Sequence, residues 1–302
     1  MHKLSQLLTT RIRLSALLPY TFNVKNSSEL IRELKQTPVT STSLFTSLDI
    51  TNKYSNIPFK ETKQILKNML ASHMTDHNIS SEILICYEVI IKQNYFAHGD
   101  RAITQTDGLT MGASSSGIIS EIFLQHFEHS HLHILDHKHK LVNYFRYVDD
   151  VLLICDTLHN DIHTILSDFN SFHPNLQFTK ETEHDKKLNY LDITIHKTPT
   201  SVNIGVFRKP TITDTMIPYT YNHLPQHKYA AIRFLYNRLN SYQLHKTEYQ
   251  REENIIQNFL HNNSFSLRPP GKQRPKLTCL PTMHPLSKNG TLSLTLAQRP
   301  PI

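Results

Sequence analysis

Two adjacent carboxylates interrupt an apolar run in the middle of the chain. Asp149 and Asp150 lie within LVNYFRYVDDVLLIC, residues 141–155. Carboxylates placed this close to a core repel each other and lose hydration, so they need a cation or hydrogen bonds in compensation. A hard divalent ion such as Mg²⁺ takes oxygen ligands and would supply it. The dipeptide alone also fits the turn of a hairpin, where Asp is common.

A third aspartate is placed to join this pair. Asp49 lies in LFTSLDIT, residues 44–51, which is rich in β-branched and aromatic residues and therefore predicts a strand. If this strand neighbours the hairpin, three carboxylates meet at one place. That is what a two-metal phosphoryl-transfer site needs, because one ion activates the attacking 3′-hydroxyl and the other stabilises the leaving pyrophosphate. Asp49, Asp149 and Asp150 are therefore the candidate catalytic and metal-binding residues.

The segments around these aspartates predict alternating strands and amphipathic helices. Pro58 stands where one helix can begin, and Ser80 or Ser81 marks the start of a second. Four of the seven glycines fall within 97–117, which predicts a loop with unusual backbone demands. Later helices are expected after 117 and over 162–169, 226–242 and 247–261, and short strands near 176–181, 188–196 and 202–208. This order favours an α+β fold with helices packed on one face of an antiparallel sheet.

The composition is that of a globular, basic protein. Apolar residues make up 38%, and Lys plus Arg outnumber Asp plus Glu by 32 to 25. A basic excess favours a polyanionic partner, with nucleic acid as the first candidate. The three cysteines lack C-x-x-C spacing, which argues against a disulfide framework and a cysteine zinc site. The cysteine pattern therefore favours an intracellular location, nuclear or cytoplasmic, without a secretion signal. Because no apolar run has transmembrane length, we also expect no membrane association.

An ordered set of motifs resembles the reverse transcriptases of Penelope-like retroelements. SLDITNKYSNIP (47–58) is similar to their motif A, QTDGLTMGASSSGIISEIFLQHFEH (105–129) to motif B with its helix, and FRYVDDVLLI (145–154) to motif C. The Y-x-D-D of motif C is a moderate signal alone, whereas the ordered set is highly specific. The resemblance covers roughly residues 20–262, and its further segments are NYF (94–96), HPNLQFTKE (173–181), KLNYLDI (187–193) and FRKPT (207–211).

The resemblance implies a right-hand polymerase palm with partial fingers and a short helical thumb. It implies RNA-directed DNA polymerisation, with an RNA template, a DNA primer, deoxynucleoside triphosphates and two Mg²⁺ ions, or Mn²⁺ in their place. The expected divisions are a fingers or N-terminal remnant (1–46), a palm with inserted fingers helices (47–206), a thumb-like region (207–262) and a disordered tail (263–302).

The resemblance also implies roles for individual residues near motif A and motif C. Asp49 and Asp149 would bind the metals with Asp150 beside them, and Ile50 would lend its backbone carbonyl. Tyr54 would be the steric gate against a ribose 2′-hydroxyl. The alternative for Tyr54 is an ordinary half-buried aromatic residue.

Roles are implied outside these two motifs as well. Met111 and Gly112 would lie under the incoming base and the templating strand, and residues 188–193 would form the primer grip. Lys186 or Lys187 would be the general acid that protonates pyrophosphate, with a solvated lysine pair as the alternative. Phosphate contacts are expected from a basic set in the thumb-like region, with a solvated helix face as the alternative: Arg208, Lys209, Lys228, Arg233 and Arg238.

Some features depart from the family pattern. Ser114 stands where the family usually has Pro, and no triphosphate-gripping basic hairpin is identifiable among the 48 residues before Asp49. Two alternatives therefore stay open: a truncated or degenerate element product that binds primer–template without efficient polymerisation, and a telomerase-like relative with another biological task. The histidine cluster at 126–139 has metal-like i,i+4 spacings, but a solvated helix end and loop is the interpretation we favour over a zinc site.

Overall fold

A four-stranded antiparallel sheet lies at the centre of the structure, a computed structural model that describes residues 2–15, 18, 22–93, 95–158, 161–213 and 215–265. The strand order is β4-β5-β1-β6. The strands are β1 (Ser43–Ile50), β4 (Asn143–Tyr147), β5 (Asp150–Asp156) and β6 (Phe178–Thr182). Several helices lie between β1 and β4, and a further helix lies between β5 and β6, so the order of this sheet follows the β-α-β-β-α-β pattern with extra elements inserted after β1. This pattern makes β1 and β5 neighbours although they are far apart in the sequence.

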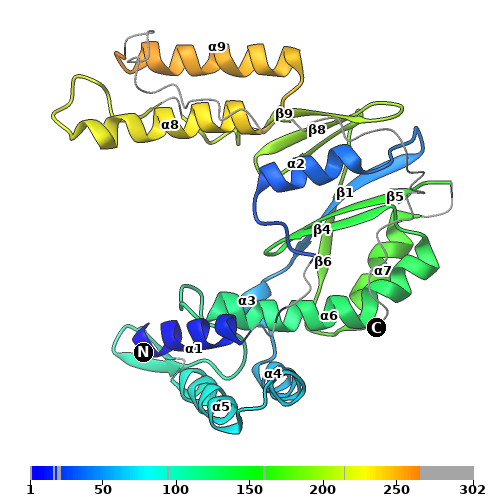
Figure 1. Cartoon of the computed structure of the whole chain (residues 1–302), viewed down its shortest axis with the longest axis vertical. Helices are drawn as coiled ribbons and strands as arrows, with labels where there is room; N and C mark the ends of the chain where they lie inside the picture. The colour runs from blue at the N-terminus through cyan, green and yellow to red at the C-terminus, as the bar shows by residue number, and fades with distance from the viewer. Residues whose placement is uncertain are drawn as a thin grey trace, which may run out of the picture.

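Both faces of this sheet are covered, which explains the uninterrupted apolar run of β5. Two helices, α6 (Ser116–His139) and α7 (Ile162–Phe172), pack on one face, as the sequence predicted (Figure 1). The other face carries α2 (Ser27–Gln36) and a second sheet of three strands. That second sheet consists of β7 (Lys187–Tyr190), β8 (Ile193–Lys197) and β9 (Val202–Val206). The strand expected near 188–196 is therefore two strands joined by a turn.

Further helices extend the apolar core beyond one end of the sheet. They are α1 (His2–Leu14), α3 (Lys53–Asn56), α4 (Phe59–His73) and α5 (His77–Lys92). Helix α1 was not expected from the sequence, yet its Leu8 and Ile12 are fully buried in the same core as α4 and α5.

Two local predictions in this part of the chain were wrong. Helix α5 begins at His77 rather than at Ser80 or Ser81, because the Asp76 side chain accepts hydrogen bonds from the first backbone N–H groups. The glycine-rich loop contains a hairpin, β2 (Tyr95–His98) and β3 (Arg101–Thr104), whose turn uses Gly99 with φ of +59°. Asn94, the first residue of the NYF segment, lies outside the described residues.

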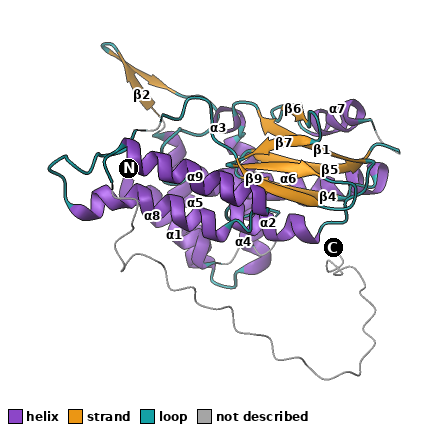
Figure 2. Cartoon of the chain, turned by 90° about the horizontal axis from the view of Figure 1, so that it is seen from above, coloured by secondary structure: helices purple, strands orange, loops and turns teal. Residues whose placement is uncertain are grey.

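An antiparallel pair of helices forms an apolar core of its own, separate from those on the two faces of the central sheet. Helices α8 (Pro225–Ser241) and α9 (Lys246–Asn262) follow the two predicted segments closely, and α9 packs against β9 (Figure 2). Their facing side chains include Ile232, Leu239 and Ile256. Of the tail expected to be disordered (263–302), residues 263–265 are ordered, with Phe265 buried in this core. The remainder, from 266 onward, lies outside the described residues. No helix in the described part of the chain is long and apolar enough to cross a membrane.

Candidate active site

The three candidate aspartates meet at one end of the β1–β5 pair. Asp49 lies directly opposite Asp150 in the antiparallel register, and the Ile50 N–H donates to the Asp149 carbonyl at 3.4 Å. The structure thus brings together three carboxylates that the sequence separates. Their catalytic and metal-binding roles, and that of the Ile50 carbonyl, stay predictions.

Crowding at this site is visible in the proton affinity of one carboxyl group. The pKa of Asp150 is raised to about 6, first by burial and then by the charges of Asp149 and Asp49. The positive charges of Lys209 and Lys53 oppose this shift without cancelling it. The site therefore holds more negative charge than the chain itself neutralises.

The donor chemistry fits the pair of divalent cations that the resemblance implies. Carboxylate oxygens are the ligands that Mg²⁺ prefers, and the raised pKa of Asp150 marks charge that a cation would relieve. Among the described residues, no group of three His, Cys, Asp or Glu side chains is already arranged as a metal site.

A buried lysine that the sequence did not single out lies beside these carboxylates. Lys53 is the first residue of α3, and its side chain is only 2% exposed. Its Nζ lies 3.8 Å from Oδ1 of Asp149 and 4.5 Å from the centroid of the Tyr54 ring. Burial lowers the pKa of Lys53, while the charge of Asp149 acts in the opposite direction. Asn52, in a left-handed conformation with φ of 50°, makes the turn that directs this lysine inward.

The candidate steric gate lies in the same turn. Tyr54 is half-buried, and its pKa is raised first by burial and then by the charge of Asp149. Its backbone carbonyl accepts the N–H of Leu109 at 2.6 Å, which docks the motif B loop onto α3. Gly108 is required at this contact, since it has φ of +82° and any Cβ would overlap the Ser55 carbonyl.

The two motif B residues expected to contact the nucleotide lie further along this loop. Met111 is 71% exposed, and Gly112 has φ of +84° with open space around it. The loop is thus free to receive a ligand on this side, and the predicted contacts remain predictions.

A buried ionic network supports the hairpin turn that carries Asp149. Arg146 is 1% exposed and donates to Glu128 from Nε at 2.6 Å and to Glu121 from both Nη atoms at 2.8–2.9 Å. It also donates to the carbonyl of Val148, a residue with φ of +60°, at 3.2 Å. The side-chain oxygen of Asn23 accepts the Val148 N–H from the other side at 3.2 Å. The sequence signal that could have indicated this network is a single arginine within an apolar strand, preceded by a helix with two glutamates seven residues apart.

The expected primer grip lies against the catalytic hairpin. The hydroxyl of Tyr190 in β7 donates to the carbonyl of Asp150 at 2.7 Å. In the turn that follows, the Asp192 carboxylate accepts hydrogen bonds from Ser27 of α2 and, at 2.5 Å, from the hydroxyl of Tyr242 just after α8. The turn is therefore connected to α2 and to the end of α8 at once, and it lines one cleft together with Asp49 and Asp150.

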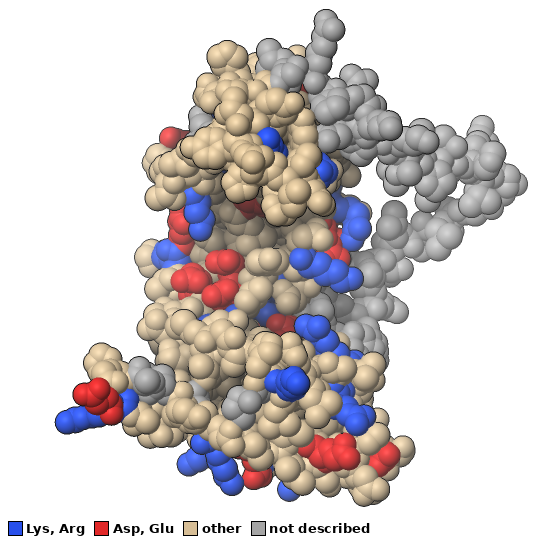
Figure 3. All heavy atoms as spheres, turned by 90° about the vertical axis from the view of Figure 1, so that its left-hand side faces the viewer, with Lys and Arg blue, Asp and Glu red and all other residues tan. Residues whose placement is uncertain are grey.

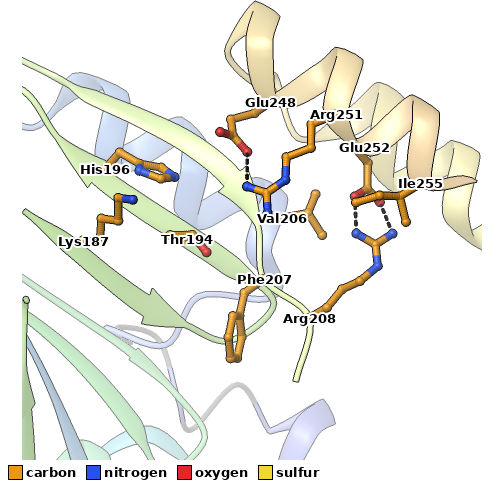
Figure 4. A pocket seen from close by; sticks show the side chains of 10 residues that line it. All are labelled: Lys187, Thr194, His196, Val206, Phe207, Arg208, Glu248, Arg251, Glu252 and Ile255. Atoms are coloured by element: carbon orange, nitrogen blue, oxygen red, sulfur yellow. Dashed lines mark hydrogen bonds and ion pairs between the residues drawn. The ribbon is translucent and has the colours of Figure 1, made fainter. Parts of the chain in front are cut away.

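The two candidate general acids lie away from that cleft. Lys186 is exposed at the turn before β7, with φ of 61°, and Lys187 lies opposite His196 in the second sheet. Lys187 lines a different pocket, between the second sheet and α9 (Figure 4). Among the described residues that line the aspartate cleft, the lysine is Lys180. A role for Lys186 or Lys187 as general acid stays a prediction that this placement does not support.

The basic residues expected to contact phosphates divide into two groups. Arg208 binds the carboxylate of Glu252, which is 3% exposed (Figure 4). Arg238 binds the same carboxylate. Arg238 is itself buried, so the expectation of a phosphate contact from it is corrected: its guanidinium holds α8 to α9. A partner inside the fold was invisible to the sequence because Glu252 lies on the next helix.

The other three basic residues remain accessible. Lys209 is exposed and close enough to Asp150 for its charge to lower the pKa of that carboxyl group. Lys228 and Arg233 lie on α8 and donate to the backbone carbonyls of Tyr219 and Gln226, respectively. Figure 3 shows acidic side chains gathered in a hollowed band, with Lys and Arg beside it. Basic groups around an acidic centre suit a ligand that carries both phosphates and metal ions.

The histidine cluster forms part of α6 instead of a helix end and loop. His139 is buried and hydrogen-bonds to Asp168 at 2.6 Å, and the ring of His131 stacks on Phe172 with centroids 4.5 Å apart. These partners connect α6 to α7. Packing between the two helices therefore explains these two histidines.

Comparison with known proteins assigns the chain to a family. Residues 3–194, more than half of the chain, match the family described as reverse transcriptase (RNA-dependent DNA polymerase). The chain belongs to the reverse transcriptase family. No curated protein sequence matches it.

Solved structures show that this reverse transcriptase family member shares its fold with telomerases. Telomerase from Candida albicans, in complex with a TWJ fragment of telomeric RNA, superposes with a TM-score of 0.59 at 12% identity. The match covers 86% of this chain and 48% of that one. Apo telomerase from Candida tropicalis gives 0.53 at 11% identity, over 86% of this chain and 49% of that one. The chain thus spans about half the length of these structures, and its central sheet corresponds to a polymerase palm.

Proposed function

We propose that the chain is the RNA-directed DNA polymerase domain of a retroelement, of the Penelope-like type. It would add deoxynucleotides from their triphosphates to the 3′ end of a DNA primer paired with an RNA template. Convergence of three carboxylates at one end of the two central strands of a palm sheet is the observation that carries this proposal. The ordered motifs around Asp49, Tyr54 and Asp149 support the Penelope-like assignment. We further propose a nuclear or cytoplasmic location, on the basis of the cysteine content and the basic charge.

In this proposal Asp49, Asp149 and Asp150 hold two Mg²⁺ ions, or Mn²⁺ in their place. Bound there, the ions would supply Lewis-acid activation of the primer 3′-hydroxyl and neutralisation of the leaving pyrophosphate. Other residues of the chain would contribute by holding the aspartates in place. Arg146 fixes the turn that carries Asp149, and Tyr190 holds the Asp150 backbone from the primer-grip strand.

Tyr54 would select the sugar of the incoming nucleotide. It lies one residue beyond the lysine that contacts Asp149, and its backbone anchors the motif B loop. A ring placed under the ribose would clash with a 2′-hydroxyl and accept a deoxyribose. The exposed Lys209 and Arg233 and the half-buried Lys228 would contact backbone phosphates, since these contacts require charge rather than a particular base sequence.

One observation favours a second candidate function, which is binding of primer–template nucleic acid without efficient polymerisation. The ammonium of Lys53 lies at Asp149, and the carboxylates around it do not form a ready metal site within the described residues. A chain fixed in this arrangement would still bind nucleic acid through its exposed basic side chains.

Primer extension on a poly-rA template with an oligo-dT primer and Mg²⁺ tests the proposed polymerase. We expect extension that disappears in Asp149→Asn, while a gel-shift assay shows that this variant still binds the duplex. Salt-sensitive binding without extension by the unsubstituted chain would support the second candidate. Extension that persists in Asp149→Asn would contradict the assignment of the site.

A further inference from the structure

Lys53 has an environment that an ordinary surface lysine lacks. Lysine is almost never fully buried unless it is paired, because its ammonium is strongly hydrated in water. Here the side chain is 2% exposed, and its Nζ lies 3.8 Å from Oδ1 of Asp149, over the face of Tyr54. The carboxylate and the electron-rich ring face are both favourable partners for a cation. The ammonium therefore occupies a cation site at the candidate catalytic aspartate.

The neighbouring charges show that Asp149 is the carboxylate paired with Lys53. Arg146, the other buried cation nearby, is already bonded by Glu121 and Glu128. Asp149 forms its ion pair with Lys53, and its side chain is 43% exposed to solvent. A cation arriving from solvent would therefore meet Asp149 with a positive charge already beside it.

We propose that the Lys53 ammonium is a built-in counter-ion for Asp149 in the metal-free chain, and that a divalent ion binding at Asp149 displaces it. The proposal rests on the proposed metal-dependent polymerase function. Lys53 keeps the crowded carboxylates together before metal binds, and it lowers the metal affinity of the site. The four-carbon stem of lysine allows the ammonium to move aside without unfolding α3.

The expected effect on metal binding follows from the charge separation. Two unit charges about 4 Å apart interact weakly in bulk water and about fourfold more strongly at the effective dielectric of a protein surface. Because Asp149 is partly exposed, the effect of Lys53 lies between these limits. Removing its charge should tighten divalent-ion binding by about tenfold.

Titration of the full chain with Mn²⁺, with free Mn²⁺ followed by electron paramagnetic resonance, tests this without any polymerase assay. Lys53→Met keeps the stem length and removes the charge, so it should bind Mn²⁺ about tenfold more tightly. Lys53→Arg keeps the charge and should resemble the unsubstituted chain. Lys67→Met removes the same net charge from an exposed position on α4 and should also leave binding unchanged. Thermal unfolding of each variant establishes that it is folded, and Lys53→Gln provides a second uncharged variant.

The outcomes separate this inference from the proposed function. If the unsubstituted chain binds Mn²⁺, and Asp149→Asn abolishes binding, the metal site is supported. Unchanged or weaker Mn²⁺ binding by Lys53→Met would then overturn the counter-ion role alone. If neither the unsubstituted chain nor Lys53→Met binds Mn²⁺, both proposals fail. Binding by Lys53→Met with none by the unsubstituted chain would support the counter-ion role in its strongest form.

Discussion

Glu128 should be one of the most sensitive positions in the chain although it touches no substrate. Its carboxylate, 2% exposed, accepts hydrogen bonds from the hydroxyl of Tyr144 at 2.9 Å and from Arg146 at 2.6 and 3.0 Å. Glu128→Ala would leave a buried hydroxyl and one edge of a buried guanidinium without partners. Breaking a buried ion pair from one side costs about 3–5 kcal/mol. We expect the lower end, about 3 kcal/mol, because Glu121 still holds the other edge of Arg146.

Thermal unfolding followed by circular dichroism measures this cost. For a chain of this size, about 3 kcal/mol corresponds to a fall in Tm of about 5 °C. Glu61→Ala is the matched control, because Glu61 is 47% exposed and its ion pair with His173 is worth at most about 1 kcal/mol. Replacing Glu128 and Arg146 together by Met should cost less than Glu128→Ala alone, since no buried charge is then left unpaired. Equal Tm values for Glu128→Ala and Glu61→Ala would refute the role assigned to the network.

Three further predictions concern the site itself. The pKa of Asp150 is about 6 in the folded chain against 3.8 ordinarily, so the folded state holds a proton that the unfolded state loses, and stability falls as pH rises through this window. After allowance for the half-exposure of Asp150, the free energy of unfolding should fall by about 1 kcal/mol between about pH 4.5 and 7.5. Urea unfolding in EDTA at these two pH values measures the fall, and Asp150→Asn should abolish it. The same fall in both chains would contradict the crowding of the carboxylates. Tyr54→Ala should raise incorporation of ribonucleotides relative to deoxynucleotides in primer extension while Tyr54→Phe does not, and an unchanged ratio would show that Tyr54 only packs. Lys209→Ala should reduce the slope of the logarithm of the nucleic-acid binding constant against the logarithm of salt concentration by about 1, whereas Arg238→Ala, at a buried position, should leave that slope unchanged. Equal slopes for the two variants would contradict the distinction between the accessible Lys209 and the buried Arg238.

Local sequence patterns were sufficient for much of the secondary structure. The apolar and β-branched run ending at Asp49 predicted β1, and the two apolar runs around Asp149 and Asp150 predicted β4 and β5. The last two helices also follow their predicted segments. The errors lie where one side chain or one turn decides the outcome, as in the Asp76 cap that starts α5 and the turn at Leu191 that divides β7 from β8.

The sequence by itself determined which residues are the candidates for the chemistry, because the aspartates and their flanking motifs are local patterns with fixed spacing. It did not determine which charges are free to act. Nothing in the sequence distinguishes Arg238 or Lys53 from solvated basic residues. In the structure, however, Arg238 is buried against Glu252 and Lys53 is buried against Asp149. The physical reason is that the effect of a charge depends on its burial and its partner. Both are supplied by segments distant in the chain, and only the tertiary structure brings those segments together.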